Sequence, residues 1–143
     1  MTLSFICNNI TSSQPISKKE LRNRSITAYV EGDLEIHVNK KLFFKEEGLL
    51  LVELYFSLKT WLSSKNKIIE DFRYESMDFE EEHILEFIER KDRTWYIHSE
   101  WQLFSAKNQS LSFIEIEQAA NSFFLSIEEE IEKIFNLNIR RLT

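Results

Sequence analysis

The sequence predicts an α+β fold, in which an antiparallel, curved sheet of about six or seven strands packs against two main helices. Three observations predict this class. Apolar and polar residues alternate in several short segments before and after residue 50, as they do in half-buried strands. Two longer segments, at about 47–63 and 113–136, have apolar residues at the 3.6-residue period of a helix. The resulting order is strands, helix, strands, helix, which is typical of α+β proteins.

Composition narrows the kind of protein further. With 143 residues and 43% hydrophobic content, residues 1–143 fit one domain with one core. Two glycines and one proline argue against propeller-like or collagen-like repeats. The single cysteine, Cys7, cannot form an internal disulfide, and no charged-then-apolar leader precedes it, so we expect a reduced, cytoplasmic protein. The longest apolar run, Leu49–Val52, is too short to span a membrane.

The first part of the chain is expected to be β-structure. Alternation and apolar content predict strands at 3–7, 26–30, 34–38 and 42–44. A three-residue loop, Glu31-Gly32-Asp33, between the second and third of these would place both apolar sets on one face of the sheet. Such a loop requires Gly32 or Asp33 in a left-handed conformation. A second turn is expected at Asn39-Lys40-Lys41.

The first helix, at about 47–63, has a narrow polar stripe. Its polar residues recur at steps of four, three and four, at Glu53, Ser57, Thr60 and Ser64. The remaining positions are mostly apolar, so the sheet is expected to cover most of the helix. At roughly 1.5–3 kcal/mol for each large apolar side chain buried, this helix should supply a large share of the stability of the fold.

Three further strands are expected at 69–77, 83–90 and 94–103. The second helix then has the clearest local signal in the chain. Ser112 fits the N-cap and Glu115 the third helical position, which is the spacing of a capping box. Asn136 suits the C-terminal cap. A long amphipathic helix at about 113–136 is therefore predicted.

No known catalytic or cofactor-binding motif is present. The sequence contains no HExxH, CxxC, GxSxG, GxGxxG or phosphate-binding P-loop pattern, and its only glycines are Gly32 and Gly48. We therefore expect no enzyme activity, no metal and no cofactor. The alternative is a small enzyme or ligand-binding domain, whose cleft would contain Tyr96, His98 and Glu100 from one face of the strand at 94–103.

Charge is unevenly distributed along the chain. The net charge is −6, yet residues 1–68 carry ten basic and seven acidic residues, whereas residues 69–143 carry eight basic and seventeen acidic ones. Because phosphate binding needs clustered cations, an acidic C-terminal half disfavours DNA or RNA as a direct ligand. It favours a basic partner, although surface acid is also common for solubility alone.

The acidic segment at 70–89 also contains aromatic residues. This combination suits a surface that binds a basic protein. A second acidic run, at 128–132, lies in the last part of the second helix, where negative charge opposes the helix dipole. For the first of these two segments, the alternative is a solvated sheet face whose aromatic side chains turn into the core. The candidate partner-binding residues are Glu70, Asp71, Tyr74, Glu75, Asp78, Phe79, Glu80, Glu81, Glu82 and Glu129.

Three runs of residues carry a resemblance to known proteins. They are Ile-Thr-Ala-Tyr-Val-Glu-Gly-Asp-Leu-Glu-Ile at 26–36, Leu-Phe-Phe-Lys-Glu at 42–46 and Trp-Tyr-Ile-His-Ser-Glu-Trp-Gln-Leu-Phe at 95–104. From about Ile26 to the final helix, the chain resembles a group of small bacterial proteins, some of which are similar to immunity proteins encoded beside polymorphic or contact-dependent growth-inhibition toxins.

This resemblance implies a cytoplasmic single-domain protein that binds a cognate toxin, often a nuclease. The charge argument adds that the C-terminal domain of the toxin is basic, and we expect a monomer or homodimer. Binding would block the active site or the substrate surface of the toxin. The resemblance assigns no binding residue, so the candidates above depend on the charge argument alone.

Overall fold

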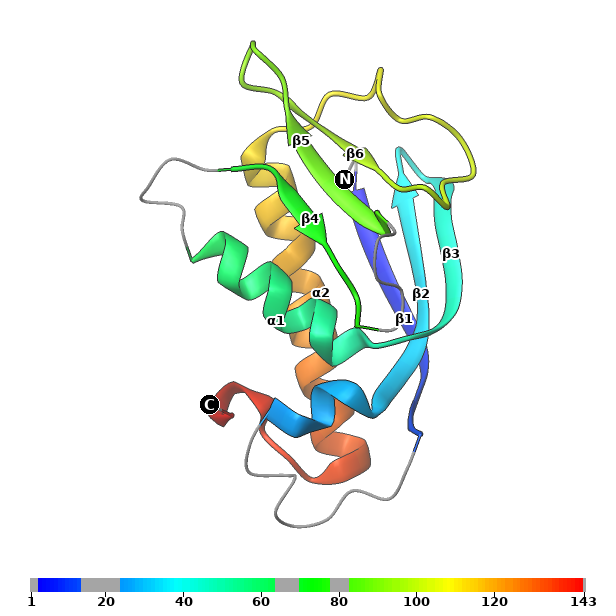
Figure 1. Cartoon of the computed structure of the whole chain (residues 1–143), viewed down its shortest axis with the longest axis vertical. Coiled ribbons are helices and arrows are strands. Elements are labelled where there is room, and N and C mark those ends of the chain that lie inside the picture. Colours follow the sequence, from blue (N-terminus) through cyan, green and yellow to red (C-terminus); the bar gives the residue numbers. More distant parts are fainter. Residues whose placement is uncertain (1–2, 14–23, 64–69, 78–82, 143) are drawn as a thin grey trace.

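The protein has an α+β architecture in a computed structural model that describes residues 3–13, 24–63, 70–77 and 83–142 (Figure 1). The predicted fold class is therefore confirmed at this level. In chain order the elements are β1 (Leu3–Ser12), the 3-10 helix η2 (Arg24–Ala28), β2 (Val30–Val38), β3 (Lys41–Leu49), α1 (Leu51–Leu62), β4 (Phe72–Tyr74), β5 (Leu85–Glu89), β6 (Trp95–His98), α2 (Phe113–Phe135) and the 3-10 helix η3 (Ile139–Arg141).

The strands form two antiparallel sheets of three strands, in the orders β1-β2-β3 and β4-β5-β6. The prediction of one sheet with six or seven strands is therefore wrong. The physical reason is a turn directly after β6, where the Gln102 N–H donates to the Ser99 carbonyl at 3.2 Å. Between the described residues, one backbone hydrogen bond from Leu103 N–H to the Phe43 carbonyl, at 2.8 Å, joins this turn to β3.

Strand β2 is continuous where a loop was predicted. Residues 31–33 belong to the strand, and every second residue from Val30 to Val38 is buried, Gly32 included. The predicted loop is wrong because the alternation of buried and less buried positions passes through Gly32 without a break. The predicted strand at 26–30 is also wrong, since Arg24–Ala28 forms a 3-10 helix. A Cβ atom on Gly32 would lie 2.6 Å from Leu51 Cδ1.

Replacing Gly32 by alanine should therefore lower the free energy of unfolding by about 1–2 kcal/mol, because the added methyl overpacks the buried contact with Leu51. Urea unfolding followed by circular dichroism measures this loss. In a Leu51→Ala background the methyl would have room, so Gly32→Ala should cost less there. An equal cost in both backgrounds would contradict the steric explanation. Thr11→Ala, an exposed change in neighbouring β1, serves as the control.

The β2–β3 hairpin confirms the turn predicted at 39–41. Asn39 and Lys40 have φ angles of 52° and 67°, the left-handed conformation that a tight two-residue hairpin needs. Strand β3 then continues to Leu49, which pairs with Gly32. The first helix consequently begins at Leu51 and not near residue 47. The reason is Gly48, whose φ of 68° cannot continue a right-handed helix and which lies where the strand register shifts.

Helix α2 was predicted correctly at both ends. The Glu115 N–H donates to Ser112 Oγ at 3.1 Å, and Asn136 ends the helix in a left-handed conformation with φ of 53°. The helix runs along much of the length of the molecule beside β1 (Figure 1), where Phe5 and Phe123 are 5.6 Å apart between ring centroids. It also packs against α1.

The core contains residues from both sheets and both main helices. An aromatic cluster is centred on Trp61, whose ring lies within 5.3–5.9 Å of four other rings. These rings belong to Phe72 in β4, Phe87 in β5, Trp95 in β6 and Phe113 in α2. The cluster therefore packs the β4-β5-β6 sheet against both α1 and α2. Within the described residues, no helix has the length and apolar character needed to cross a membrane.

Candidate functional site

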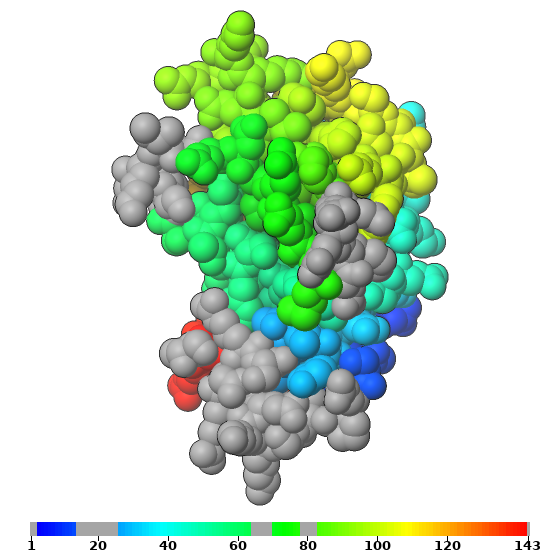
Figure 2. Space-filling view, viewed as in Figure 1, coloured from blue at the N-terminus to red at the C-terminus, as the bar shows by residue number. Residues whose placement is uncertain are grey.

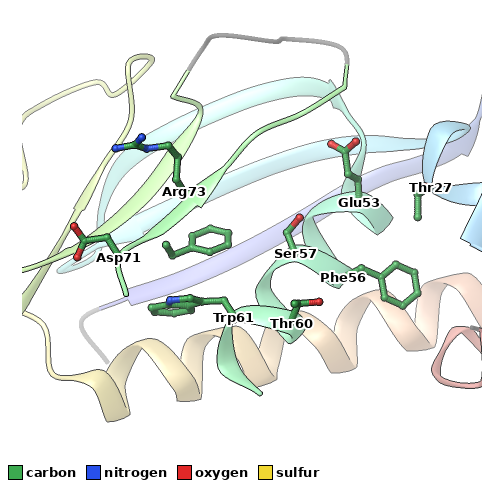
Figure 3. Close-up of a pocket in the computed structure, with 9 residues that line it drawn as sticks. Thr27, Glu53, Phe56, Ser57, Thr60, Trp61, Asp71 and Arg73 are labelled. Carbon is green, nitrogen blue, oxygen red and sulfur yellow. The ribbon is translucent and has the colours of Figure 1, made fainter. Parts of the chain in front are cut away.

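A groove of about 580 Å³ lies at the surface between α1 and β4 (Figure 3). We call it the α1–β4 groove. Figure 2 shows these two elements next to each other on one face of the molecule. The lining residues are Thr27, Glu53, Phe56, Ser57, Thr60, Trp61, Asp71, Phe72 and Arg73.

The wall formed by α1 is the polar stripe that the sequence predicted. Glu53, Ser57 and Thr60 all line the groove, because steps of four and three residues return to the same face of a helix. Ser64, the fourth member of the stripe, lies outside the described residues. On the opposite side, α1 buries its apolar residues, with Tyr55 and Leu58 fully covered. The polar stripe therefore borders a hollow and not a flat surface.

The carboxylate of Glu53 is held in place at the groove. One of its oxygens accepts a hydrogen bond from the Tyr74 hydroxyl at 2.6 Å, and the other accepts from the Met77 N–H at 3.2 Å. Tyr74 itself is 1% exposed, so it cannot serve as the exposed aromatic anchor that the sequence suggested. Its contribution to the groove is indirect, since it positions Glu53. Sequence reasoning did not select Glu53 as a site residue.

Acidic residues flank β4, the strand that forms the other wall of the α1–β4 groove. Glu70, Asp71 and Glu75 are all exposed, and they surround β4 in the sequence. Asp71 also lines the groove, where its Oδ1 accepts a hydrogen bond from the Glu89 N–H at 2.9 Å. Glu129 is exposed on α2, an element that does not line the groove. The candidates Asp78, Phe79, Glu80, Glu81 and Glu82 lie outside the described residues.

Arg73, the cation among the lining residues of the groove, forms an ion pair with Glu86, which does not line the groove. Its Nε donates to Glu86 Oε2 at 3.0 Å, across the β4–β5 pairing that places the two residues opposite each other. The groove therefore presents two carboxylates, those of Glu53 and Asp71, while its arginine is already paired. Hydroxyl groups and the rings of Phe56 and Trp61 complete the lining. This combination suits a basic, partly apolar segment of another protein.

Glu86 is the centre of a row of charged residues across the second sheet. Its side chain is 6% exposed. His98, opposite it on β6, places Nδ1 3.0 Å from Glu86 Oε1, and His83 places Nδ1 3.3 Å from the same oxygen. We call Glu86, Arg73, His83 and His98 the Glu86 cluster. The sequence reasoning treated these residues separately, because the register that brings them together is a property of the folded sheet.

Burial and the neighbouring residues Arg73, His83 and His98 together set the pKa of Glu86. Burial is the strongest influence and raises the pKa of Glu86, but the hydrogen bonds from His98 and Arg73 and the charge of His83 together hold that pKa below its usual value. Glu86 is therefore a carboxylate at neutral pH. Because a carboxylate only accepts hydrogen bonds, the proton in the His98 contact is on Nδ1 of the imidazole.

A second hollow, of about 330 Å³, borders the Glu86 cluster. We call it the β6 cavity. Tyr96 and His98 both line it, as the alternative functional prediction requires, but Glu100 does not. Glu100 is exposed, and its N–H donates to the His83 carbonyl at 3.0 Å. The other lining residues are Glu86, Ile88, Ile97, Gln102, Ser105 and Lys107. In the part of the chain that the structure describes, no group of three His, Cys, Asp or Glu side chains could hold a metal ion.

The fold and the groove define a small α+β protein with an acidic surface hollow. The chain belongs to the family described as Domain of unknown function (DUF7878), whose model matches residues 5–133. This match includes both sheets, α1 and all but the last residues of α2. No curated protein and no solved structure matches the sequence.

Proposed function

We propose that this protein is an immunity protein, which binds a cognate bacterial toxin and neutralises it by covering the active site or substrate surface. It acts by binding and not by catalysis. The observation that carries the proposal is the acidic α1–β4 groove, where the carboxylates of Glu53 and Asp71 occupy two walls and Arg73 is paired with Glu86. The exposed residues Glu70 and Glu75 extend the negative charge along the same chain segment.

A toxin that cleaves nucleic acid needs a positively charged surface to hold phosphates. Opposite charge on an inhibitor increases the rate of encounter with such a surface, and buried aromatic contacts then slow release. In the groove, Phe56 and Trp61 are partly exposed and could contact a partner, while Glu53 and Asp71 could receive its lysine or arginine side chains. We expect the partner to be the basic C-terminal domain of a toxin, and nucleic acid itself to be excluded.

We also propose that the protein acts in the cytoplasm. If the toxin is a nuclease, its nucleic-acid substrate lies in the cytoplasm, so the immunity protein is needed there. A lone cysteine, Cys7, fits a reducing compartment, and burial raises the pKa of its thiol to about 12. The protein would act there as a monomer or homodimer.

The direct test is to co-express the protein with the C-terminal domain encoded by the gene immediately upstream. The proposal expects a complex that co-purifies and cells that survive expression of that domain. Survival should require this protein and not an unrelated acidic protein of similar size. No complex together with no protection would overturn the proposal.

Charge reversal at two exposed acidic residues near the groove in the sequence then tests whether this surface meets the toxin. Changing Glu70 and Glu75 together to lysine should slow association with the toxin domain by about tenfold or more at low salt, and the difference should shrink at high salt. Stopped-flow mixing at two salt concentrations measures these rates.

The matched control changes Glu47 and Glu132 to lysine, which alters the net charge equally on β3 and α2, away from the groove. If both double variants slow association to the same extent, the total charge matters and the groove does not.

A further inference from the structure

The β6 cavity has the size and lining of a small-molecule site. Its volume of about 330 Å³ lies at the lower end of the range typical of ligand pockets. Ile88 and Tyr96 are partly exposed and line the cavity, so they provide an apolar surface. Gln102, Ser105 and Lys107 provide polar groups from the segment after β6. The cavity therefore combines an apolar surface with several hydrogen-bonding groups.

The β6 cavity is lined by one cation, Lys107, although the whole chain is acidic. Its one carboxylate, Glu86, is balanced within the protein by Arg73 at 3.0 Å and by the contact with His98 at 3.0 Å. Lys107 is exposed, and Arg90 lies 5.0 Å from the centroid of the Tyr96 ring. Among the described residues, neither Lys107 nor Arg90 forms an ion pair. Arg90 is already engaged, since its Nη1 donates to Ser110 Oγ at 2.9 Å and its charge lowers the pKa of Asp92, so Lys107 is the cation that a ligand in the cavity would meet.

The orientation of His98 presents a second hydrogen-bonding atom. Because Nδ1 is engaged by Glu86, the ring is fixed and its second nitrogen, Nε2, remains for a ligand. No hydrogen bond to Nε2 comes from the described residues. When the imidazole is protonated, Nε2–H can donate to an anion. The charged groups that face His98 are Glu86 from β5, His83 before β5, Arg73 from β4 through Glu86, and Lys107 across the cavity.

We propose that the β6 cavity binds a small anionic ligand, in which a carboxylate or phosphate group is attached to a compact apolar part. Lys107 and His98 hold the anionic group, and Gln102 and Ser105 donate further hydrogen bonds. Ile88 and the Tyr96 ring pack against the apolar part. This site uses residues of β5, β6 and the segment that follows, and it does not depend on toxin neutralisation at the α1–β4 groove.

The test is a titration of the full chain followed by the backbone amide signals in NMR, with sodium benzoate and inorganic phosphate as the two probes. We expect saturable shifts at residues 86–88, 96–98 and 102–107. Saturation by benzoate assigns a carboxylate ligand and saturation by phosphate assigns a phosphate ligand, and either result supports the proposal.

Three variants make the test specific. Lys107→Ala removes an exposed charge and should weaken binding about tenfold or more, and His98→Gln should also weaken binding because the imidazole contact is lost. Lys91→Ala, which alters an exposed lysine outside the cavity lining, should leave the affinity unchanged. Absence of saturation with both probes, or equal weakening by Lys91→Ala and Lys107→Ala, would overturn the proposal. Protection against the toxin should be unchanged in Lys107→Ala, which separates this site from the proposed immunity function.

Discussion

Replacing Trp61 by alanine should lower the free energy of unfolding by about 3 kcal/mol, the lower end of the range for truncating a large core aromatic. Trp61 is only partly buried, but its ring contacts those of Phe72, Phe87, Trp95 and Phe113 at centroid distances of 5.3–5.9 Å. Removal of the indole therefore leaves a cavity among three strands and two helices. Urea unfolding followed by far-UV circular dichroism gives the loss without relying on tryptophan fluorescence.

Two further variants separate the contributions of Trp61. Trp61→Phe keeps a ring in the cluster but removes the 2.7 Å hydrogen bond from Nε1 to the Glu70 carbonyl, so it should cost about 1 kcal/mol. Trp101→Ala removes a partly buried tryptophan that stacks on Phe44 at 6.4 Å and should cost less than Trp61→Ala. If Trp61→Ala costs no more than Trp101→Ala, the cluster does not have the central role described here.

Replacing Glu86 by glutamine should lower the free energy of unfolding by about 2 kcal/mol at neutral pH. The variant leaves Arg73 and the nearby imidazoles without their shared carboxylate. The value is below that for a fully buried ion pair, because 53% of the Arg73 side chain is exposed and water can replace part of the interaction. Thermal and urea unfolding measure the loss, and Glu100→Gln, at a neighbouring exposed position, is the control.

The same variant should change the acid sensitivity of the protein. The pKa of Glu86 is lower in the folded protein than its usual value of 4.5, so its ionised form adds stability above that value and the added stability is lost as the pH falls through the folded-state pKa. The difference between wild type and Glu86→Gln should therefore shrink between about pH 5 and about pH 3. A difference that stays constant over this interval would show that the Glu86 charge does not contribute.

The sequence predictions were correct where the interactions that determine an element lie within a few residues of it. Helix α2 was located correctly because Ser112, Glu115 and Asn136 form its caps within a few residues of each end. The polar stripe on α1 was also found, because helical periodicity is a local property. The start of α1 was missed because the pairing of Leu49 with Gly32 extends β3, and such pairing is decided by residues distant in the sequence.

Gly32 shows a second reason for error. The residue was interpreted as a turn former, whereas it is small because Leu51 packs against its Cα. A glycine required by close packing and a glycine required by backbone conformation are identical in a single sequence. The separation into two sheets was equally hidden, since it follows from the turn at Ser99–Gln102.

The candidate site was predicted only in part. The sequence selected Asp71, Glu70 and Glu75 by charge, but charge alone could not indicate that Glu53 lines the same groove as Asp71. Nor could it show that Tyr74 is buried, because an aromatic residue in a short strand has the same pattern on either face. The Glu86 cluster needed the register of β4, β5 and β6, which places Arg73 and His98 on either side of Glu86.

The contact between β1 and α2 has a consequence for synthesis of the chain. Phe5 emerges from the ribosome first, yet it packs against Phe123 near the other end of the sequence. The inner face of the earliest strand therefore stays bare until residues of the last long helix have been translated. The contact between β1 and α2 can therefore form only after Phe123 has left the ribosome, and until then the apolar side of β1 can contact other chains.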